Sequence, residues 1–129
     1  MSKPETITWA PAPAAQDYPA ALSYLSLVLT PARAAAIVAL LQAASTSNWH
    51  AKDILRAARL PLLPADDAEV RKDLKRVRKG IALSPILLVR GDATAGQLLQ
   101  IADGYHRVCA SYHLQEDTAI PALCADMPS

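Results

Sequence analysis

Apolar residues recur every three or four positions in four stretches of the first 80 residues, and this spacing predicts four helices. The expected helices cover residues 17–29, 31–44, 50–59 and 66–79. Thr30 followed by Pro31 marks a helix start, because threonine caps a helix and proline is tolerated in its first turn. Residues 45–48 are expected to end the second helix.

Each helical stripe also predicts which side chains face the core. The expected inward-facing residues are, in chain order, Ala20, Ala21, Leu22, Leu25 and Val28; Ile37, Leu40, Leu41 and Ala44; Ile54, Leu55 and Ala58; and Val70, Leu74, Val77 and Ile81. The first stretch also fits a strand, because its serines alternate with bulkier residues; we favour the helix. Asp66 or Asp67 is expected to cap the fourth helix, and Gly80 is expected to end it.

The second half of the chain replaces helical spacing with short apolar runs, which predict strands. Strands at residues 85–90 and 97–102 flank a turn at 91–96 and form a hairpin. A helix at 105–114 and a last strand at 119–124 follow. This order of elements predicts an α+β fold.

Length and composition fit a single domain. The chain has 129 residues, of which 52% are hydrophobic, and this is sufficient for one core. The proline-containing residues 1–17 have little to bury and are expected to form a flexible arm or a loosely docked segment. The single domain is therefore expected to span residues 18–129.

The charge balance and the apolar runs limit the class of protein. Thirteen basic and twelve acidic residues leave a net charge of +1, which argues against a general polyanion binder. No apolar run approaches the ~20 residues that span a bilayer, and residues 1–10 lack the apolar core of a signal peptide. We expect a cytoplasmic protein without membrane contact. Its Cys109 and Cys124 are expected to be reduced, buried small residues, and their spacing predicts no metal site.

The segment Asp103-Gly104-Tyr105-His106-Arg107 concentrates the chemistry of the chain. Gly104 permits a sharp reversal, and a helix that starts there points free backbone N–H groups at an anion. His106 and Arg107 add donors, and an arginine can hold a phosphate through two parallel hydrogen bonds. Asp103 could bind Mg²⁺ or accept a proton from a hydroxyl. The segment therefore predicts a phosphate-binding turn with one carboxylate at its edge.

A purely structural interpretation of these residues stays open. Asp103 could cap the helix, His106 could lie at the edge of the core, and Arg107 could pair with a surface acid. Short glycine-containing turns before helices are common, so the five residues alone do not decide. The Trp49-His50 pair is expected to pack rather than to form a site.

Two stretches of the chain resemble the ParB/sulfiredoxin superfamily. The first is a strand, Asp-Gly-x-His-Arg, a helix and the Ile120-Pro121 strand. The second is Leu63-Pro64, a capped helix, a glycine and a Pro-Ile strand. Together they cover residues 62–125. The resemblance implies a small mixed sheet with packed helices, preceded by a helical N-terminal extension.

The resemblance also implies nucleotide binding at the turn. In ParB proteins the corresponding turn binds nucleotide phosphates, and in free-serine kinases of this fold the turn looks most like Asp-Gly-x-His-Arg, with an aspartate that assists phosphoryl transfer. The expected phosphate-binding residues are then Gly104, Tyr105, His106 and Arg107, the expected catalytic residue is Asp103, and the expected ligand is ATP, ADP or CTP with Mg²⁺. Tyr105 stands where sulfiredoxins carry their reactive cysteine, and no helix-turn-helix region follows, so neither sulfiredoxin chemistry nor DNA clamping is expected.

A basic run on the helix at 66–79 supports an alternative function, a non-enzymatic module that binds DNA or a protein partner. Helical spacing places four basic side chains on one exposed face: Lys72, Lys75, Arg76 and Lys79. A solvated helix face explains the same run. The first turn of this helix carries acids, which fit capping and could also hold Mg²⁺ or a substrate amine: Asp66, Asp67 and Glu69.

Overall fold

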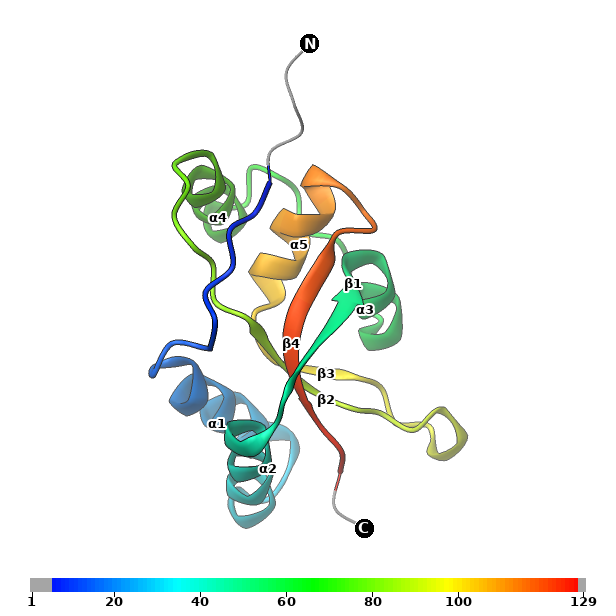
Figure 1. The fold of residues 1–129 in the computed structure, drawn as a ribbon. Helices are drawn as coiled ribbons and strands as arrows, with labels where there is room; N and C mark the ends of the chain where they lie inside the picture. Colours follow the sequence, from blue (N-terminus) through cyan, green and yellow to red (C-terminus); the bar gives the residue numbers. More distant parts are fainter. Residues whose placement is uncertain (1–5, 128–129) are drawn as a thin grey trace.

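Two groups of helices enclose a four-stranded sheet in the computed structural model, which describes residues 6–127 (Figure 1). The elements in chain order are α1 (Asp17–Val28), α2 (Pro31–Ala43), β1 (Thr46–His50), α3 (Ala51–Ala58), α4 (Ala68–Arg78), β2 (Ile86–Val89), the 3₁₀ turn η1 (Ala93–Ala95), β3 (Gln100–Asp103), α5 (Tyr105–Leu114) and β4 (Ala119–Ala125).

The sheet is mixed, with the strand order β1-β4-β2-β3. The two central strands, β2 and β4, run parallel, whereas β1 and β3 pair antiparallel with their neighbours at the two edges. Helix α5 lies in the connection from β3 to β4. The predicted α+β class is confirmed.

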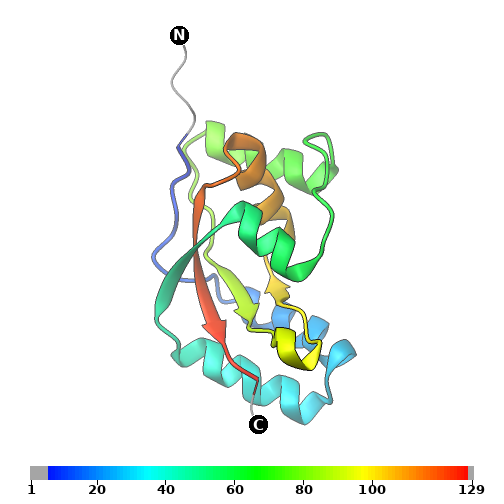
Figure 2. The same cartoon turned by 90° about the vertical axis from the view of Figure 1, so that its right-hand side faces the viewer.

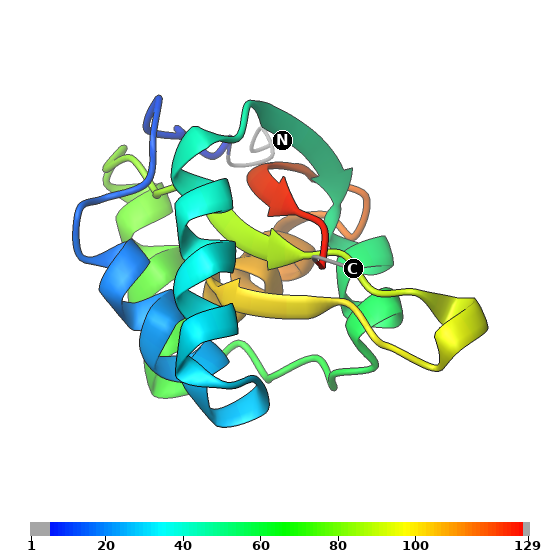
Figure 3. The same ribbon diagram turned by 90° about the horizontal axis from the view of Figure 1, so that it is seen from below.

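Side-chain alternation along β2 divides the core into two clusters. Ile86 and Leu88 point to the face covered by α3, α4 and α5, while Leu87 and Val89 point to the face covered by α1 and α2. Figures 2 and 3 show the α1–α2 pair crossing one side of the sheet, with the other three helices on the opposite side. All four β2 residues are buried, which explains the continuous apolar run in the sequence.

The predicted helices are confirmed, and their ends follow local sequence rules. The Thr30 hydroxyl accepts the N–H of Arg33, and the Asp67 carboxylate accepts the N–H groups of the second and third residues of α4. Gly80, at φ +71°, ends α4 as expected, because the chain there turns through a left-handed residue. None of the helices in residues 6–127 has the length and apolar character needed to cross a membrane.

Several residues that the helical stripes predicted to face inward are exposed. Leu40 is 48% exposed because Val38, together with Ile37 and Leu41, completes the buried face of α2. Ile81 is 50% exposed because Gly80 has already turned the chain away from the helix axis. The other predicted core residues that are exposed are Ala20, Leu22 and Val28 on α1.

Strand β1 was not predicted, because residues 45–48 were expected only to end α2. Its five residues are almost all exposed, so they carry no alternation of buried and exposed side chains. Backbone pairing with β4 creates the strand, with Thr46 opposite Leu123 and His50 opposite Ala119. The sequence of such an edge strand does not predict it, because the strand depends on pairing with its partner.

The predicted hairpin of β2 and β3 is confirmed, with a later start for its second strand. Residue 97 pairs with Asp92 in an isolated bridge that closes η1, and regular pairing with β2 begins at Gln100. The backbone of the intervening residues packs closely against Gly91. The hairpin loop is therefore longer and more exposed than expected.

The segment before α1 contacts the domain. Leu83 donates its N–H to Thr8 and accepts the N–H of Ala10, each at 2.8 Å, which forms a short parallel bridge. Residues 1–5 of the predicted arm lie outside the described residues. The proposed boundary at residue 18 stays a prediction.

Leu74→Ala is expected to lower the free energy of unfolding by about 3 kcal/mol, because Leu74 is only 6% exposed and its loss leaves a cavity between α4 and the sheet. Urea denaturation of the full chain measures the loss. Ile81→Ala is the matched control and should change stability by less than about 0.5 kcal/mol. A loss below about 1 kcal/mol for Leu74→Ala would contradict the packing of α4.

Candidate functional site

The predicted turn lies where β3 ends and α5 begins. Gly104 is the N-cap of α5 at φ +114°, a conformation that disfavours any other residue. A Cβ at this position would lie 2.4 Å from Cγ2 of Ile86 and 2.9 Å from Nη2 of Arg107. The absence of a side chain therefore lets the start of α5 pack directly against β2.

The first backbone N–H groups of α5 are not capped by a side chain. Gly104 offers none, and its carbonyl accepts the N–H of Val108 at 3.0 Å. The N–H groups of the first three helical residues have no partner within the helix, and the helix dipole adds partial positive charge at this end. The turn thus has the backbone geometry of an anion site.

Arg107 points into the protein rather than away from it. Its Nη2 lies 2.7 Å from Oδ2 of Asp103, and its Nη1 lies 3.9 Å from Oδ2 of Asp17. The side chain is 16% exposed, and its buried Nε has no hydrogen-bond partner within residues 6–127. Arg107 therefore joins α5 to the end of β3 and to the start of α1.

Asp17 is the residue of this cluster that the sequence analysis missed. It is buried at the first position of α1, and its Oδ2 also accepts the N–H of Ala14 at 3.0 Å. The sequence offered only an acid in a first helical turn, a common feature of exposed helices. Its partner Arg107 follows 90 residues later, so no local pattern connects the two.

Burial raises the pKa of the Asp103 carboxyl, and the neighbouring Asp17 adds to the rise, while Arg107 opposes both. Burial also raises the pKa of Asp73 on α4, against the opposing charges of Arg76, Arg107 and His106. Asp17 and Asp103 thus contact one guanidinium, and the charge of that guanidinium also reaches Asp73 on a third element. The surroundings of the turn therefore include acids from outside residues 103–107, namely Asp17 and Asp73.

Tyr105 and His106 share the exposed side of the turn. Their ring centres are 5.7 Å apart, and the Tyr105 hydroxyl donates to the Pro61 carbonyl. Burial raises the pKa of Tyr105, so its hydroxyl stays protonated at neutral pH. His106 is half-exposed and makes no hydrogen bond within the described part of the chain. Tyr105 therefore anchors the link before α4, and His106 remains available to a ligand.

The structure places no ready-made metal site beside the turn. No group of three or more His, Cys, Asp or Glu side chains in residues 6–127 could hold a metal ion. Asp67 caps α4, and Glu69 pairs with Lys72 at 3.2 Å, so two of the acids at this helix start have structural partners.

The basic face of α4 is exposed as expected, but half of its charge is paired. Lys72 contacts Glu69 and Arg76 contacts Asp73, each at 3.2 Å. The two unpaired members of the face, within the described residues, are Lys75 and Lys79.

The two cysteines differ. Cys109 is fully buried on α5, as predicted, and burial raises the pKa of its thiol, which argues against a nucleophilic role. Cys124 is only half-buried, contrary to the expectation that both would be buried, because β4 presents it to a cavity at the far end of the sheet. Neither forms a disulfide.

The raised pKa of Asp103 predicts a pH dependence of stability. A carboxyl whose pKa is higher in the folded protein binds its proton more tightly there, so it stabilises the fold most below its ordinary pKa of 3.8. That contribution is lost as the pH rises through the folded value. The free energy of unfolding of Asp103→Asn should therefore fall less than that of the wild type between acidic and neutral pH. Urea denaturation of both proteins across a pH series measures the difference. Asp126→Asn, at an exposed position, is the control; equal pH profiles for wild type and Asp103→Asn would contradict the prediction.

Comparisons of the chain with protein-family models, with curated proteins and with solved structures gave no match.

Proposed function

We propose that the turn at residues 103–107 binds the phosphate of a nucleotide, in a domain of ParB/sulfiredoxin type. The observation that carries this proposal is the uncapped start of α5 at Gly104, with half-exposed His106 beside it. The N–H groups of residues 105–107 and the His106 ring are the donors. The order of β2, β3, glycine, α5 and a β4 strand parallel to β2 supports the resemblance of the fold.

Arg107 and Asp103 have linked roles in this proposal. Arg107 supplies positive charge behind the turn and is held in place by Asp103 and Asp17. If Mg²⁺ accompanies the nucleotide, Asp103 at the edge of the turn would be the carboxylate that could contact it, and the ion would neutralise phosphate charge. If the ligand is ATP, Asp103 accepts the proton of an acceptor hydroxyl while the terminal phosphoryl group passes to that oxygen and ADP leaves. The candidate nucleotides are ATP, ADP and CTP, and the setting is cytoplasmic.

Calorimetric titration of the full chain with ATP, ADP, CTP and sulfate, with and without Mg²⁺, tests the proposal. His106→Ala should weaken nucleotide binding about tenfold, since it removes one donor to an anion. His50→Ala, at an exposed position on β1, is the matched control and should leave binding unchanged. Asp103→Asn should maintain or strengthen metal-free binding and lower any formation of ADP. If none of the ligands binds at millimolar concentration, the turn is structural and the proposal fails.

The alternative function is binding of DNA or of a protein partner by the basic face of α4. Exposed Lys75 and Lys79 favour it, because neither has a partner acid in the described chain. Replacing both with glutamine should weaken salt-sensitive retention on DNA if this face is an interface. Unchanged retention would show that the basic face of α4 is a solvated helix face and not an interface.

A further inference from the structure

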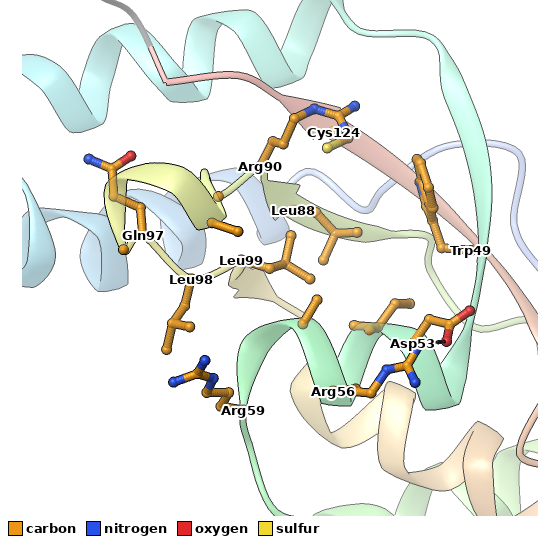
Figure 4. Close-up of a pocket in the computed structure, with 15 residues that line it drawn as sticks. Trp49, Asp53, Arg56, Arg59, Leu88, Arg90, Gln97, Leu98, Leu99 and Cys124 are labelled. Carbon is orange, nitrogen blue, oxygen red and sulfur yellow. Dashed lines mark hydrogen bonds and ion pairs between the residues drawn. The ribbon is translucent and has the colours of Figure 1, made fainter.

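A cavity of about 640 Å³ lies at the end of the sheet opposite the turn (Figure 4). Its lower wall is α3, its upper wall is the start of the hairpin loop, and Trp49 of β1 closes one side. The floor is apolar and includes Ile54, Leu88 and Leu99. A cavity of this volume with an apolar floor matches the usual dimensions of a small-molecule site.

The walls of this cavity are fixed by backbone contacts. The N–H of Leu99 donates to the Ala57 carbonyl at 3.3 Å, which ties the hairpin to α3. A Cβ on Gly91 would lie 2.4 Å from the Gln97 carbonyl oxygen, so only glycine lets the two arms of the loop approach this closely. These contacts fix the backbone of the hairpin loop against α3 on one side of the cavity.

Three arginines line the cavity against a single acid. Arg56 and Arg59 extend from α3, and Arg90 lies across the cavity at the end of β2 (Figure 4). Arg56 pairs with Asp53 at 3.1 Å, and Arg90 pairs with Asp126 at 2.7 Å. Both pairs are exposed, and such pairs contribute little, so an anionic ligand can replace either carboxylate.

Arg59 occupies a position that favours glycine. It ends α3 at φ +53°, the one non-glycine residue in residues 6–127 with a positive φ. The Arg59 N–H donates to the Arg56 carbonyl, and the Leu60 N–H donates to the Leu55 carbonyl. Glycine is the usual residue at a helix end with these bonds. The Arg59 guanidinium makes no hydrogen bond or ion pair within the described chain. Arg59 therefore adds positive charge to the rim, on the side of the cavity opposite Arg90 (Figure 4).

Trp49 and Arg90 place an aromatic face beside a positive charge. The Arg90 guanidinium lies 5.9 Å from the centre of the Trp49 ring. Burial raises the pKa of the adjacent Cys124 thiol, which stays protonated and uncharged at pH 7. The site thus joins an aromatic wall, an apolar floor and an arginine rim.

We propose that this cavity binds a small organic anion composed of a planar ring and one carboxylate or phosphate group. The ring packs between Trp49 and the apolar floor, and Arg90, beside Trp49, holds the anionic group by charge-assisted hydrogen bonds. The site is separate from the proposed nucleotide site. Asp103 pairs with Leu87 near the start of β2, whereas the cavity is lined by Leu88 and Arg90, toward the end of β2.

Nuclear magnetic resonance titration of the ¹⁵N-labelled full chain tests this site directly. The chain has two tryptophans, so the Trp49 indole N–H reports on the cavity and the Trp9 indole N–H is an internal control. The probes are benzoate and phenyl phosphate, which combine a ring with an anionic group. Inorganic phosphate tests the anionic group alone, and benzyl alcohol tests the ring alone. Benzoate or phenyl phosphate should shift the Trp49 signal and bind at least about tenfold more tightly than either part. The Trp9 signal and the amide signals of residues 104–107 should not move.

Arg90→Gln separates binding from folding. Arg90 forms only an exposed ion pair, so the melting temperature should hardly change, while benzoate affinity falls about tenfold or more. Arg59→Gly is the matched control: it removes the same charge on the opposite side of the cavity, and glycine suits the left-handed backbone, so both stability and affinity should be maintained. An unmoved Trp49 signal at millimolar probe, or unchanged affinity in Arg90→Gln, would overturn the proposal. Nucleotide binding at the turn is read from different signals, so each proposal can fail alone.

Discussion

Gly104→Ala is expected to destabilise the protein by about 4 kcal/mol. Two costs add together: a positive φ of 114° costs a non-glycine residue about 1–2 kcal/mol, and an overpacked methyl group costs about 1–3 kcal/mol. The clash cannot be relieved by a flexible side chain, because Ile86 is fully buried in the central strand, and its Cγ2 atom lies 2.4 Å from the point that a Cβ on residue 104 would occupy. Urea denaturation measures the change.

Gly96→Ala is the matched control for this experiment. Gly96 has a comparable positive φ of 72°, but a Cβ there meets nothing within 4 Å. Its replacement should therefore cost only about 1 kcal/mol, the backbone contribution alone. The difference between the two variants isolates the close contact of the turn with β2. Equal losses in both would contradict the packing of α5 against Ile86.

Arg107→Met is expected to lower stability at neutral pH by about 4 kcal/mol. The substitution preserves much of the side-chain volume but leaves Asp17 and Asp103 close together without their shared cation. Removing one partner of a buried ion pair costs about 3–5 kcal/mol, because the remaining charge is buried and unpaired. The exposed pair of Arg56 with Asp53 supplies the control: Arg56→Met should cost less than about 1 kcal/mol.

A rescue experiment tests the cause of this loss. Combining Arg107→Met with Asp17→Asn and Asp103→Asn removes both uncompensated carboxylates, so the triple variant should recover most of the lost stability. Recovery would show that electrostatics, rather than packing, explains the effect of Arg107→Met. A triple variant no more stable than Arg107→Met would contradict the proposed network.

The local sequence was sufficient for the elements that depend on near neighbours. Helix caps such as Thr30 and Asp67, and the helix-ending Gly80, act within four residues of their own positions, so their signals lie in the sequence itself. The buried run of β2 and the turn at Gly104 were predicted for the same reason. The α+β class followed from the order of these elements.

The tertiary structure alone decided the features that join distant parts of the chain. Strand β1 exists because β4 pairs with it, and its own exposed residues carry no strand pattern. Asp17 meets Arg107 across 90 residues, and Trp49 meets Arg90 across the rim of a cavity that three separate segments enclose. The sequence by itself determined the helices, the central strands and the turn, because their causes are local. The charge balance around the turn and the cavity arose only when folding brought remote residues together.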